Sequence, residues 1–495
     1  MSSLRRMTEI AGGEPVTEIA RDYPGFPTVV MLAAGMGSRV ARLGNGRPKP
    51  TIPVLGLSLA ERVILTYQAS GIHHFVVVLG YQADEVREHV LDIAARRGCE
   101  VECVVAKDWR LGNGASALAA SSVLSEESFL LTMADHLIDP SLVEQVLRFP
   151  PAEAEICLAV DSNKEDLLDV EDVTKVQVAD GRVVRIGKEL SEWETADTGV
   201  FYCTQALFEG IRRASAKGQY GLSDAVRELA AERRVRVVDV TGEKWIDMDN
   251  AVAFRHAKRR LLSSVVKNTD DGYVSQHLNR PLSLRLSSLL AGTRISPDGI
   301  TVAAFVLSLA GAAFLALPSY LAGLLGGLLV QFSSVVDGCD GEVARLRQIA
   351  SPRGGWLDTI LDRYADLAVV LAITFAYSSS SAGHPGALAW MGGFLSLSGF
   401  FMASYVTKEY ALRHGKPYPA DFLNRIKRRD LRLLGISVGA VFGVAFQAMV
   451  ALGVLSHLCV AGILARGWQH GRRVRPAAPL GPTPVLKKTP GSGVV

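Results

Sequence analysis

The chain has 495 residues, with 53 Lys and Arg against 50 Asp and Glu, which gives a formal net charge of +3. This length predicts at least two domains, and the near-neutral balance argues against a nucleic-acid partner. The cysteines are scattered without metal-ligand spacing, so we expect reduced cytosolic thiols and neither a disulfide framework nor a zinc site. They are Cys99, Cys103, Cys157, Cys203, Cys339 and Cys459.

The composition changes along the chain. Residues 1–26 are polar and lack the apolar core of a signal peptide, so we expect a flexible lead. The following part is mixed and charged, whereas most residues after Ile300 are apolar. Membrane targeting is therefore expected from the later segments.

Residues 27–262 alternate short apolar runs with amphipathic patterns. This alternation predicts a parallel, doubly wound sheet, that is, an α/β Rossmann-like domain. The expected strands are Thr28–Ala34, Phe75–Gly80, Val101–Ala106 and Phe129–Ala134. Ligands on such sheets bind at the carboxyl ends of the strands.

The first strand runs into a glycine-containing loop. Gly35 and Gly37 allow close approach of a ligand to the backbone, and Ser38 and Arg39 add donors suited to phosphate. Lys49 stands between two prolines on a stiff segment. A Gly-x-Gly alone also occurs in tight turns, but the combination with Ser-Arg and Pro-Lys-Pro favours phosphate binding.

This combination resembles the nucleotidyltransferases that activate sugar phosphates and alcohol phosphates, over about residues 27–262. The resemblance implies that Lys49 neutralises charge at the α-phosphorus. The triphosphate-binding residues that it implies are Leu32, Ala33, Ala34, Gly35, Met36, Gly37, Ser38, Arg39 and Lys49. A later run resembles the turn that reads the nucleobase, with an ordinary Asn-Gly turn as an equal alternative. It consists of Gly112, Asn113, Gly114 and Ser116.

Carboxylates follow the strands of this domain. Asp135 comes directly after the strand Phe129–Ala134, where it can hold Mg²⁺ on a triphosphate, and His136 is expected to be a neighbour rather than a ligand. The second metal carboxylate of the resembled family falls on Asp247 or Asp249, and we favour Asp249.

Two further runs resemble the family's acceptor pocket. Lys188 would bind the phosphate of the acceptor and Asp197 its hydroxyls, with Thr198 and Gly199 beside them. Alternatively, either run belongs to a β-hairpin and not to the acceptor pocket.

Residues 263–298 form the predicted linker, with a polar joint and then an amphipathic helix over Asp271–Leu290 that suits a membrane interface. A span needs about 20 residues. The expected spans are Ile300–Leu317, Ser319–Val336, Leu357–Tyr377, Ala387–Val406 and one or two within Leu433–Ala465.

Charge decides the number of spans. The loop Thr407–Arg432 carries eight Lys and Arg, whereas Ser378–Gly386 carries none. Positive loops stay cytoplasmic, and an even number of spans keeps both ends of the domain on that side. We therefore expect an all-α, six-helix transmembrane domain over residues 299–467 with both termini inside. Residues 468–495 are expected to be a disordered tail.

Four aspartates border these spans. Asp337 and Asp340 are three residues apart and Asp358 and Asp362 four apart, so each pair shares one helix face. Four carboxylates that face each other can hold two hard divalent cations. Such residues at the edge of a membrane segment are costly and indicate a functional site.

This stretch resembles the signature of the CDP-alcohol phosphatidyltransferase family. The resemblance implies that the four aspartates bind Mg²⁺ or Mn²⁺ and that Asp362 also acts as the base toward the acceptor hydroxyl. The residues that it implies for the CDP-alcohol are Gly341, Ala344, Arg345 and Gly354. Asp298 stands where the family has Asn, which leaves the role of that position open.

The basic loop has two equal interpretations. It is a topology signal that contacts anionic lipid, or it supplies an anion pocket for a phosphorylated acceptor. The best candidates for the pocket are Arg428, Arg429 and Arg432.

The pair of domains resembles the bifunctional inositol-1-phosphate cytidylyltransferases fused to CDP-inositol:inositol-1-phosphate transferases. This resemblance implies CTP and inositol 1-phosphate as substrates, CDP-inositol as the intermediate, a phosphorylated di-inositol phosphate as the product, and a homodimer in the cell membrane. One alternative is transfer onto a lipid hydroxyl. Another is a decayed membrane-anchored scaffold, against which Lys49 and Asp135 argue.

Overall fold

The computed structural model describes residues 26–473 except 41–43, 45, 125–127, 168–169, 267–271 and 381–385. The chain forms two compact units. Among the described residues, the first unit holds those from 26 to 266 with 287–294 and 342–350, and the second holds those from 272 to 286, 295 to 341 and 351 to 473. The predicted lead and most of the predicted tail lie outside the described residues.

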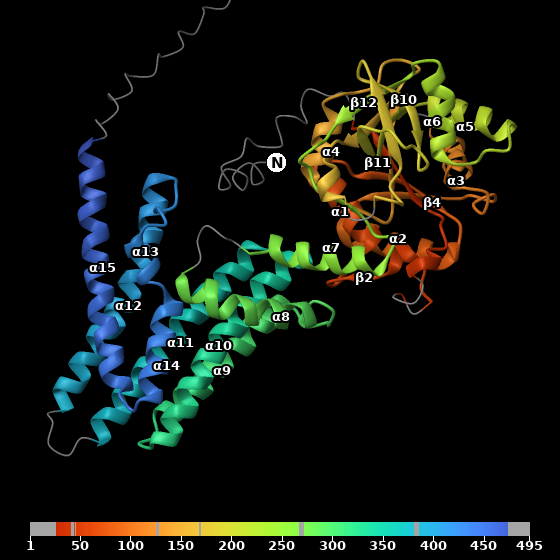
Figure 1. Cartoon of the computed structure of the whole chain (residues 1–495). Helices are drawn as coiled ribbons and strands as arrows, with labels where there is room; N and C mark the ends of the chain where they lie inside the picture. Colours follow the sequence, from red (N-terminus) through yellow and green to blue (C-terminus); the bar gives the residue numbers. More distant parts are fainter. Residues whose placement is uncertain are drawn as a thin grey trace, which may run out of the picture. The chain divides into compact units, whose positions relative to one another are not determined.

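A nine-stranded sheet forms the centre of the first unit, in the order β5-β4-β1-β6-β11-β8-β12-β10-β9. Figure 1 draws its strands as arrows among the helices of this unit. Its first four strands are parallel and confirm the four predicted strands to within one residue. They are β5 (Glu100–Val105), β4 (His74–Leu79), β1 (Thr28–Ala33) and β6 (Ser128–Met133).

The other half of the sheet differs from the predicted parallel arrangement. β11 (Thr195–Thr204) runs antiparallel to both β6 and β8 (Ile156–Asp161), so the sheet is mixed. Parallel pairing resumes between β8 and β12 (Val235–Asp239), and β9 (Lys175–Ala179) forms a hairpin with β10 (Arg182–Gly187). β11 follows this hairpin directly in the chain. A short loop can lead into an antiparallel strand, whereas a parallel strand would need a longer crossover connection.

Helices cover both faces of the sheet and bury it in two separate cores. One core packs against α1 (Leu59–Ala69), α2 (Ala83–Arg97) and α4 (Pro140–Leu147). The other packs against α3 (Asn113–Leu118), α5 (Ala206–Ala216) and α6 (Leu222–Ala231). Burial on both faces explains why the strands read as continuous apolar runs.

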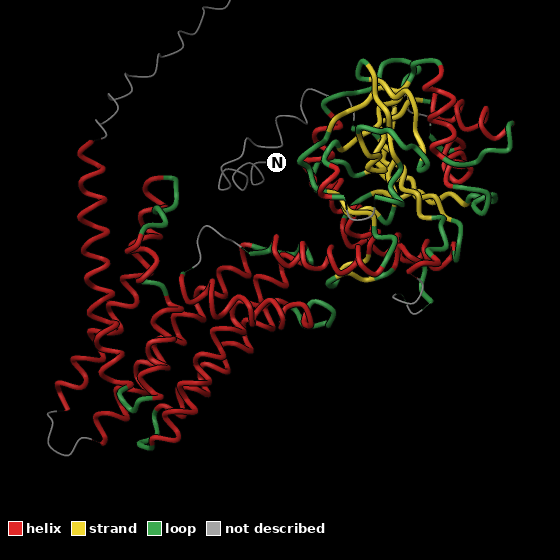
Figure 2. The backbone as a smooth tube through the Cα atoms, viewed as in Figure 1, coloured by secondary structure: helices red, strands yellow, loops and turns green. Residues whose placement is uncertain are grey.

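In the second unit, the described residues outside the loops are helical (Figure 2). The helices are α8 (Arg280–Leu290), which starts in the linker, α9 (Pro297–Leu315), α10 (Tyr320–Leu346), α11 (Pro352–Ser380), α12 (Gly386–His414), α13 (Phe422–Ile426), α14 (Arg429–Val441) and α15 (Ala445–Arg473). The last helix continues past residue 467, where we had expected the tail to begin.

Four of these helices are long and apolar enough to cross a membrane, by length and composition: α9, α10, α12 and α15. The other two predicted spans fall on α11 and α14. α11 carries charged residues within its span, Asp358, Asp362, Arg363 and Asp366 among them. α14 has 13 residues, about 20 Å of helix against a hydrocarbon core of about 30 Å. The six predicted helices are present. However, α11 is more charged, and α14 shorter, than an ordinary membrane span.

Glycines decide how α14 packs. The predicted run Leu433–Ala465 divides into two helices at Gly443, whose φ of 71° belongs to the left-handed region. A Cβ on Gly327 of α10 would lie 2.7 Å from the Cβ of Ala440, and one on Gly439 would lie 2.5 Å from the Cβ of Ala448. These small residues therefore let neighbouring helices of the bundle approach closely.

Candidate active sites

The first unit contains a cleft of about 960 Å³. The predicted nucleotide and acceptor residues that line it are Leu32, Ala34, Gly35, Gly112, Asn113, Ser116, Lys188, Asp197 and Gly199. The lining also includes Asp135 and Asp249. The loops after β1 and β6 contribute to it, so the cleft lies at the carboxyl ends of parallel strands, where we expect a ligand.

Lys49 lies in a short turn that prolines hold in place. The backbone N–H of Thr51 donates to the carbonyl of Pro48 at 3.0 Å and closes the turn. The Lys49 side chain is 7% exposed; its Nζ lies 2.5 Å from Asp135 Oδ2 and also contacts Asp249. Although burial alone lowers its pKa, the carboxylates of Asp135 and Asp249 raise the pKa of Lys49 above its ordinary value, so it remains a cation.

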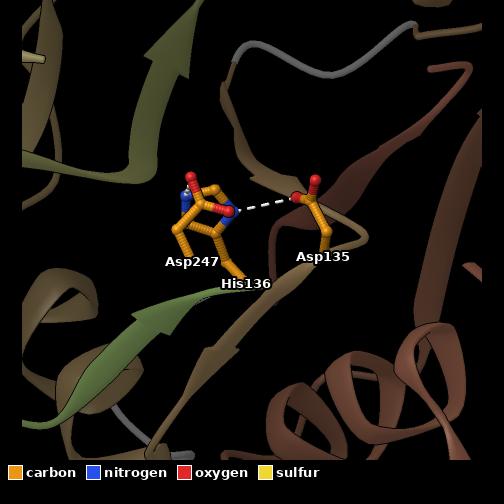
Figure 3. A group of neighbouring side chains, drawn as sticks. All are labelled: Asp135, His136 and Asp247. Carbon is orange, nitrogen blue, oxygen red and sulfur yellow. Dashed lines mark hydrogen bonds and ion pairs between the residues drawn. The ribbon is translucent and has the colours of Figure 1, made fainter. Parts of the chain in front are cut away.

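Three side chains meet on a small two-stranded ribbon beside Lys49 (Figure 3). Asp135 precedes β7 (His136–Ile138), and Asp247 ends β13 (Trp245–Asp247) opposite His136. His136 Nδ1 lies 2.9 Å from Asp135 Oδ1, and its Nε2 lies 4.0 Å from Asp247 Oδ2. The ring also stacks on Trp245 at an interplanar angle of 5°.

The donors of this cluster fit a divalent cation. One ligand atom from each of Asp135, His136 and Asp247 lies within 4.8 Å of the others. Asp247 Oδ1 is buried and has no hydrogen-bond partner among the described residues. Burial first, and then the neighbouring carboxylates against the opposing charge of His136, raise the pKa of Asp247 to about 6.

The expected second carboxylate, Asp249, lies with Lys49 and within 3.6 Å of the guanidinium of Arg39. Our preference for Asp249 over Asp247 stays a prediction. His136, which we expected to be a neighbour rather than a ligand, lies within 4.0 Å of both Asp135 and Asp247. Its place next to Asp135 is its only signal in the sequence.

The predicted acceptor residues divide into two groups. Lys188 follows β10, and its Nζ lies 2.5 Å from Asp172, which also pairs with Arg39. Asp172 belongs to no motif and escaped the sequence analysis. Asp197 Oδ1 accepts from the backbone N–H of Gly199 at 2.7 Å, in a bulge of β11.

Gly199 has a structural requirement of its own. Its φ is +75°, and a Cβ there would lie 2.8 Å from the ring of His136. Thr198, in contrast, does not reach the cleft as we had expected for the acceptor pocket. Its side chain is fully buried and donates to the carbonyl of Ala159 at 2.9 Å.

The candidate nucleobase turn begins α3. A Cβ on Gly112 or Gly114 would lie 2.4 or 2.7 Å from the carbonyl oxygen of Tyr220, so glycine is required by packing at both positions. Asn113 Oδ1 accepts from the backbone N–H of Leu222 at 2.8 Å, and Ser116 Oγ donates to the Gly112 carbonyl at 3.1 Å. Asn113 and Ser116 also line the cleft, so reading of the base stays a prediction.

In the second unit, three of the four predicted metal aspartates come together. Ligand atoms of Asp337 from α10 and of Asp358 and Asp362 from α11 lie within 4.8 Å of one another. Asp340 Oδ2 accepts from the hydroxyl of Thr301 on α9 at 2.6 Å and stands outside this group. Oxygen donors of this kind fit hard divalent cations.

Of the three candidate arginines, Arg429 contacts two of the metal aspartates. Its Nη1 lies 2.6 Å from Asp362 Oδ1 and 3.4 Å from Asp337 Oδ2, and its Nε lies 3.0 Å from Asp366. Arg432 pairs with Asp366 at 3.7 Å, and Arg428 occupies the N-cap position of α14 without a side-chain capping bond.

The residues implied for the CDP-alcohol lie along α10 and at the start of α11. Gly341 and Ala344 lie on α10, and Arg345 Nε donates to the carbonyl of Val265 at 2.8 Å. A Cβ on Gly354 would lie 3.3 Å from Asp298 Oδ1. Asp298 lies in the first turn of α9, where the helix dipole favours a negative charge.

Two families match these two halves. Residues 29–237 match the MobA-like NTP transferase domain, and residues 294–471 match the CDP-alcohol phosphatidyltransferases. A protein of Rubrobacter xylanophilus named bifunctional IPC transferase and DIPP synthase is 36% identical over 431 residues, which are 86% of this chain and 93% of that protein. The chain belongs to the family of bifunctional IPC transferases and DIPP synthases.

Other members of this family are similar over most of the chain. The one from Aquifex aeolicus is 30% identical over 89% of this chain and 98% of its own length. A solved structure of the inositol-1-phosphate CTP transferase from T. maritima is 26% identical over 47% of this chain and 93% of that chain, with a TM-score of 0.43. Membership makes this chain a bifunctional enzyme with a nucleotidyltransferase unit and a CDP-alcohol phosphotransferase unit.

Proposed function

We propose that the first unit converts CTP and inositol 1-phosphate into CDP-inositol and pyrophosphate. The second unit then transfers phosphoinositol from CDP-inositol to another inositol 1-phosphate and releases CMP, which gives phosphorylated di-inositol phosphate. The observation that carries this proposal is the similarity, over both units at once, to relatives named bifunctional IPC transferase and DIPP synthase. The assembled Lys49 and Asp362 sites support it.

In the first step, a phosphate oxygen of inositol 1-phosphate attacks the α-phosphorus of CTP. Lys49 neutralises the charge that develops there, because it is a buried cation in contact with Asp135, which lines the cleft. Lys188 binds the phosphate of the acceptor and Asp197 its hydroxyls. When bound, Mg²⁺ or Mn²⁺ held by Asp135 with Asp247 or Asp249 supplies positive charge to the triphosphate.

In the second step, Asp362 takes the proton of the attacking inositol hydroxyl and CMP leaves from phosphorus. Arg429 and Arg432 bind the phosphate of the acceptor, since a guanidinium matches phosphate with two parallel donors. Gly341 and Gly354 leave room for the CDP moiety. Asp337, Asp340, Asp358 and Asp362 would hold divalent cations, which would supply positive charge to the transferred phosphoryl group.

We further propose that the enzyme is a homodimer that spans the cell membrane with both termini and both sites on the cytoplasmic side. Four apolar helices support insertion into a bilayer. The contrast between the basic loop Thr407–Arg432 and the uncharged Ser378–Gly386 supports the orientation.

Mass spectrometry of the products tests the chemistry. Purified enzyme receives CTP, Mg²⁺ and a panel of phosphorylated polyols, inositol 1-phosphate among them. We expect CDP-inositol and then a water-soluble di-inositol product. No CDP-inositol would overturn the first step, and a product that partitions into organic solvent would replace the second step by transfer onto a lipid.

A further inference from the structure

Asp366 lies one helical turn beyond Asp362 on α11. It belongs to none of the motifs described in the sequence. Its side chain is 3% exposed. Among the described residues, three guanidinium groups from two helices converge on it. Arg429 Nε lies 3.0 Å from Oδ1, Arg363 Nη1 lies 3.2 Å from Oδ2, and Arg432 Nη2 lies 3.7 Å from Oδ2.

Arg432 has donors that no described residue satisfies. Its side chain is 3% exposed, yet its Nε and Nη1 have no hydrogen-bond partner. Its Cζ lies 4.5 Å from the centre of the Phe400 ring, which fixes the plane of the guanidinium. Buried N–H groups without a partner are costly, so this orientation indicates that a ligand with acceptor oxygens completes the site.

Arg363 is held in a comparable way from a third helix. Its Nη1 donates to the hydroxyl of Ser404 on α12 at 2.6 Å. Lys427 adds a further buried cation near the group, with its Nζ donating to the Ala403 carbonyl at 2.7 Å. The cations Arg363, Lys427, Arg429 and Arg432 therefore gather around Asp366, and positive charge of this kind suits the binding of phosphate.

Arg429 links this group to the metal aspartates, because it also bonds Asp362 and Asp337. A phosphate bound between Arg429 and Arg432 would bring the rest of the acceptor close to Asp362, the predicted base. The direction of Arg429 is set from the other side by Asp366.

We propose that Asp366 is a positioning residue for the second reaction: it holds Arg363, Arg429 and Arg432 so that they bind the phosphate of the acceptor. This inference rests on the proposed function, because it assumes a phosphorylated acceptor. Asp366 acts through the arginines and touches no reacting atom.

The test uses the full-length enzyme with Asp366→Asn and Asp366→Glu. If Asp366 positions the arginines, both variants raise the KM for inositol 1-phosphate in the second step by at least about tenfold, the size expected when a charge-assisted hydrogen bond to phosphate is lost. The KM for CDP-inositol and the rate of the first step stay unchanged. Asp421→Asn is the matched control, since Asp421 pairs with Arg466 away from this group.

Charge alone makes the opposite prediction. If Asp366 merely repelled the phosphate, Asp366→Asn would lower the KM for the acceptor, and that result overturns the proposal. An equal fall in kcat for all substrates, with the acceptor KM unchanged, would indicate a purely structural residue and would also overturn it.

Asp366→Asn leaves buried arginines without their counter-charge and can unfold the membrane unit. Ser404→Ala then decides, because it loosens Arg363 without a change of charge; we expect a raised acceptor KM, and an unchanged one contradicts the proposal. The thermal unfolding temperature in the presence of inorganic phosphate measures phosphate binding without turnover. Phosphate should stabilise the wild-type enzyme more than Asp366→Glu, in which only the phosphate site of the first unit remains, and equal stabilisation of both overturns the inference. Absence of a di-inositol product from wild-type enzyme would instead contradict the proposed function.

Discussion

Lys49 shows how one residue combines a backbone constraint with electrostatics. The proline-bounded turn holds its Nζ between Asp135 and Asp249 in a buried position. We expect Lys49→Gln to reduce CDP-inositol formation at least about a hundredfold, because it removes a preorganised charge from the reacting phosphate. Transfer from supplied CDP-inositol should remain. The assay is CTP-dependent CDP-inositol formation by the purified enzyme.

The exposed Lys107→Gln serves as the control for this substitution. Retention of most of the first-step activity by Lys49→Gln would show that Lys49 has a structural role rather than a catalytic one.

Asp197 illustrates a conflict between stability and function at the same scale. Burial, partly offset by the hydrogen bond from Gly199, raises the pKa of Asp197 from 3.8 to about 6. The folded state therefore binds more protons than the unfolded state between these values, and stability falls as the pH rises from about 4 to 6. Above pH 6 the cost is about 3 kcal/mol.

We therefore expect Asp197→Asn to be more stable than wild type at pH 7.5 and equal to it at pH 4, because Asn can still accept from Gly199 without a buried charge. Thermal unfolding at the two pH values measures this. The same variant should bind inositol 1-phosphate more weakly. A stability gain that does not depend on pH would contradict the assignment to the Asp197 charge.

At the scale of elements, single glycines set the distance between helices of the bundle. A Cβ on Gly327 would meet Ala440 at 2.7 Å, whereas a Cβ on Gly323, one turn away on α10, would meet nothing within 4 Å. We expect Gly327→Ala to lower the free energy of unfolding by about 1–3 kcal/mol through overpacking, and the unfolding temperature with it. Gly323→Ala should leave it unchanged or slightly raised, since Ala favours a helix.

Thermal unfolding in detergent compares the two variants directly. Equal effects would indicate that α10 and α14 do not pack through Gly327.

At the scale of the whole molecule, the two reactions share one chain but use separate sets of residues. We expect Lys49→Gln to impair the first step and Asp362→Asn the second. Because CDP-inositol is a soluble intermediate, we expect an equimolar mixture of these two inactive variants to form di-inositol product from CTP and inositol 1-phosphate. Mass spectrometry of the mixture and of each variant alone measures this. No product from the mixture would show that the intermediate does not leave the chain that makes it.

The sequence alone determined the two-unit organisation, the four parallel strands and the candidate site residues of both units. Periodicity and motif spacing are local properties, so β1 and its phosphate loop, and the paired aspartates of α10 and α11, could be read along the chain. Similarity over both units then confirmed the family.

Only the tertiary structure decided which of these residues meet. The antiparallel direction of β11, the inward orientation of Thr198 and the place of Asp340 beside Thr301 depend on long-range pairing. Asp366 and Asp172 carried no sequence signal of a functional role, because an Asp outside a motif is usually a solvated surface residue. Their partners come from distant segments, and a contact between such segments leaves no local pattern in a single sequence.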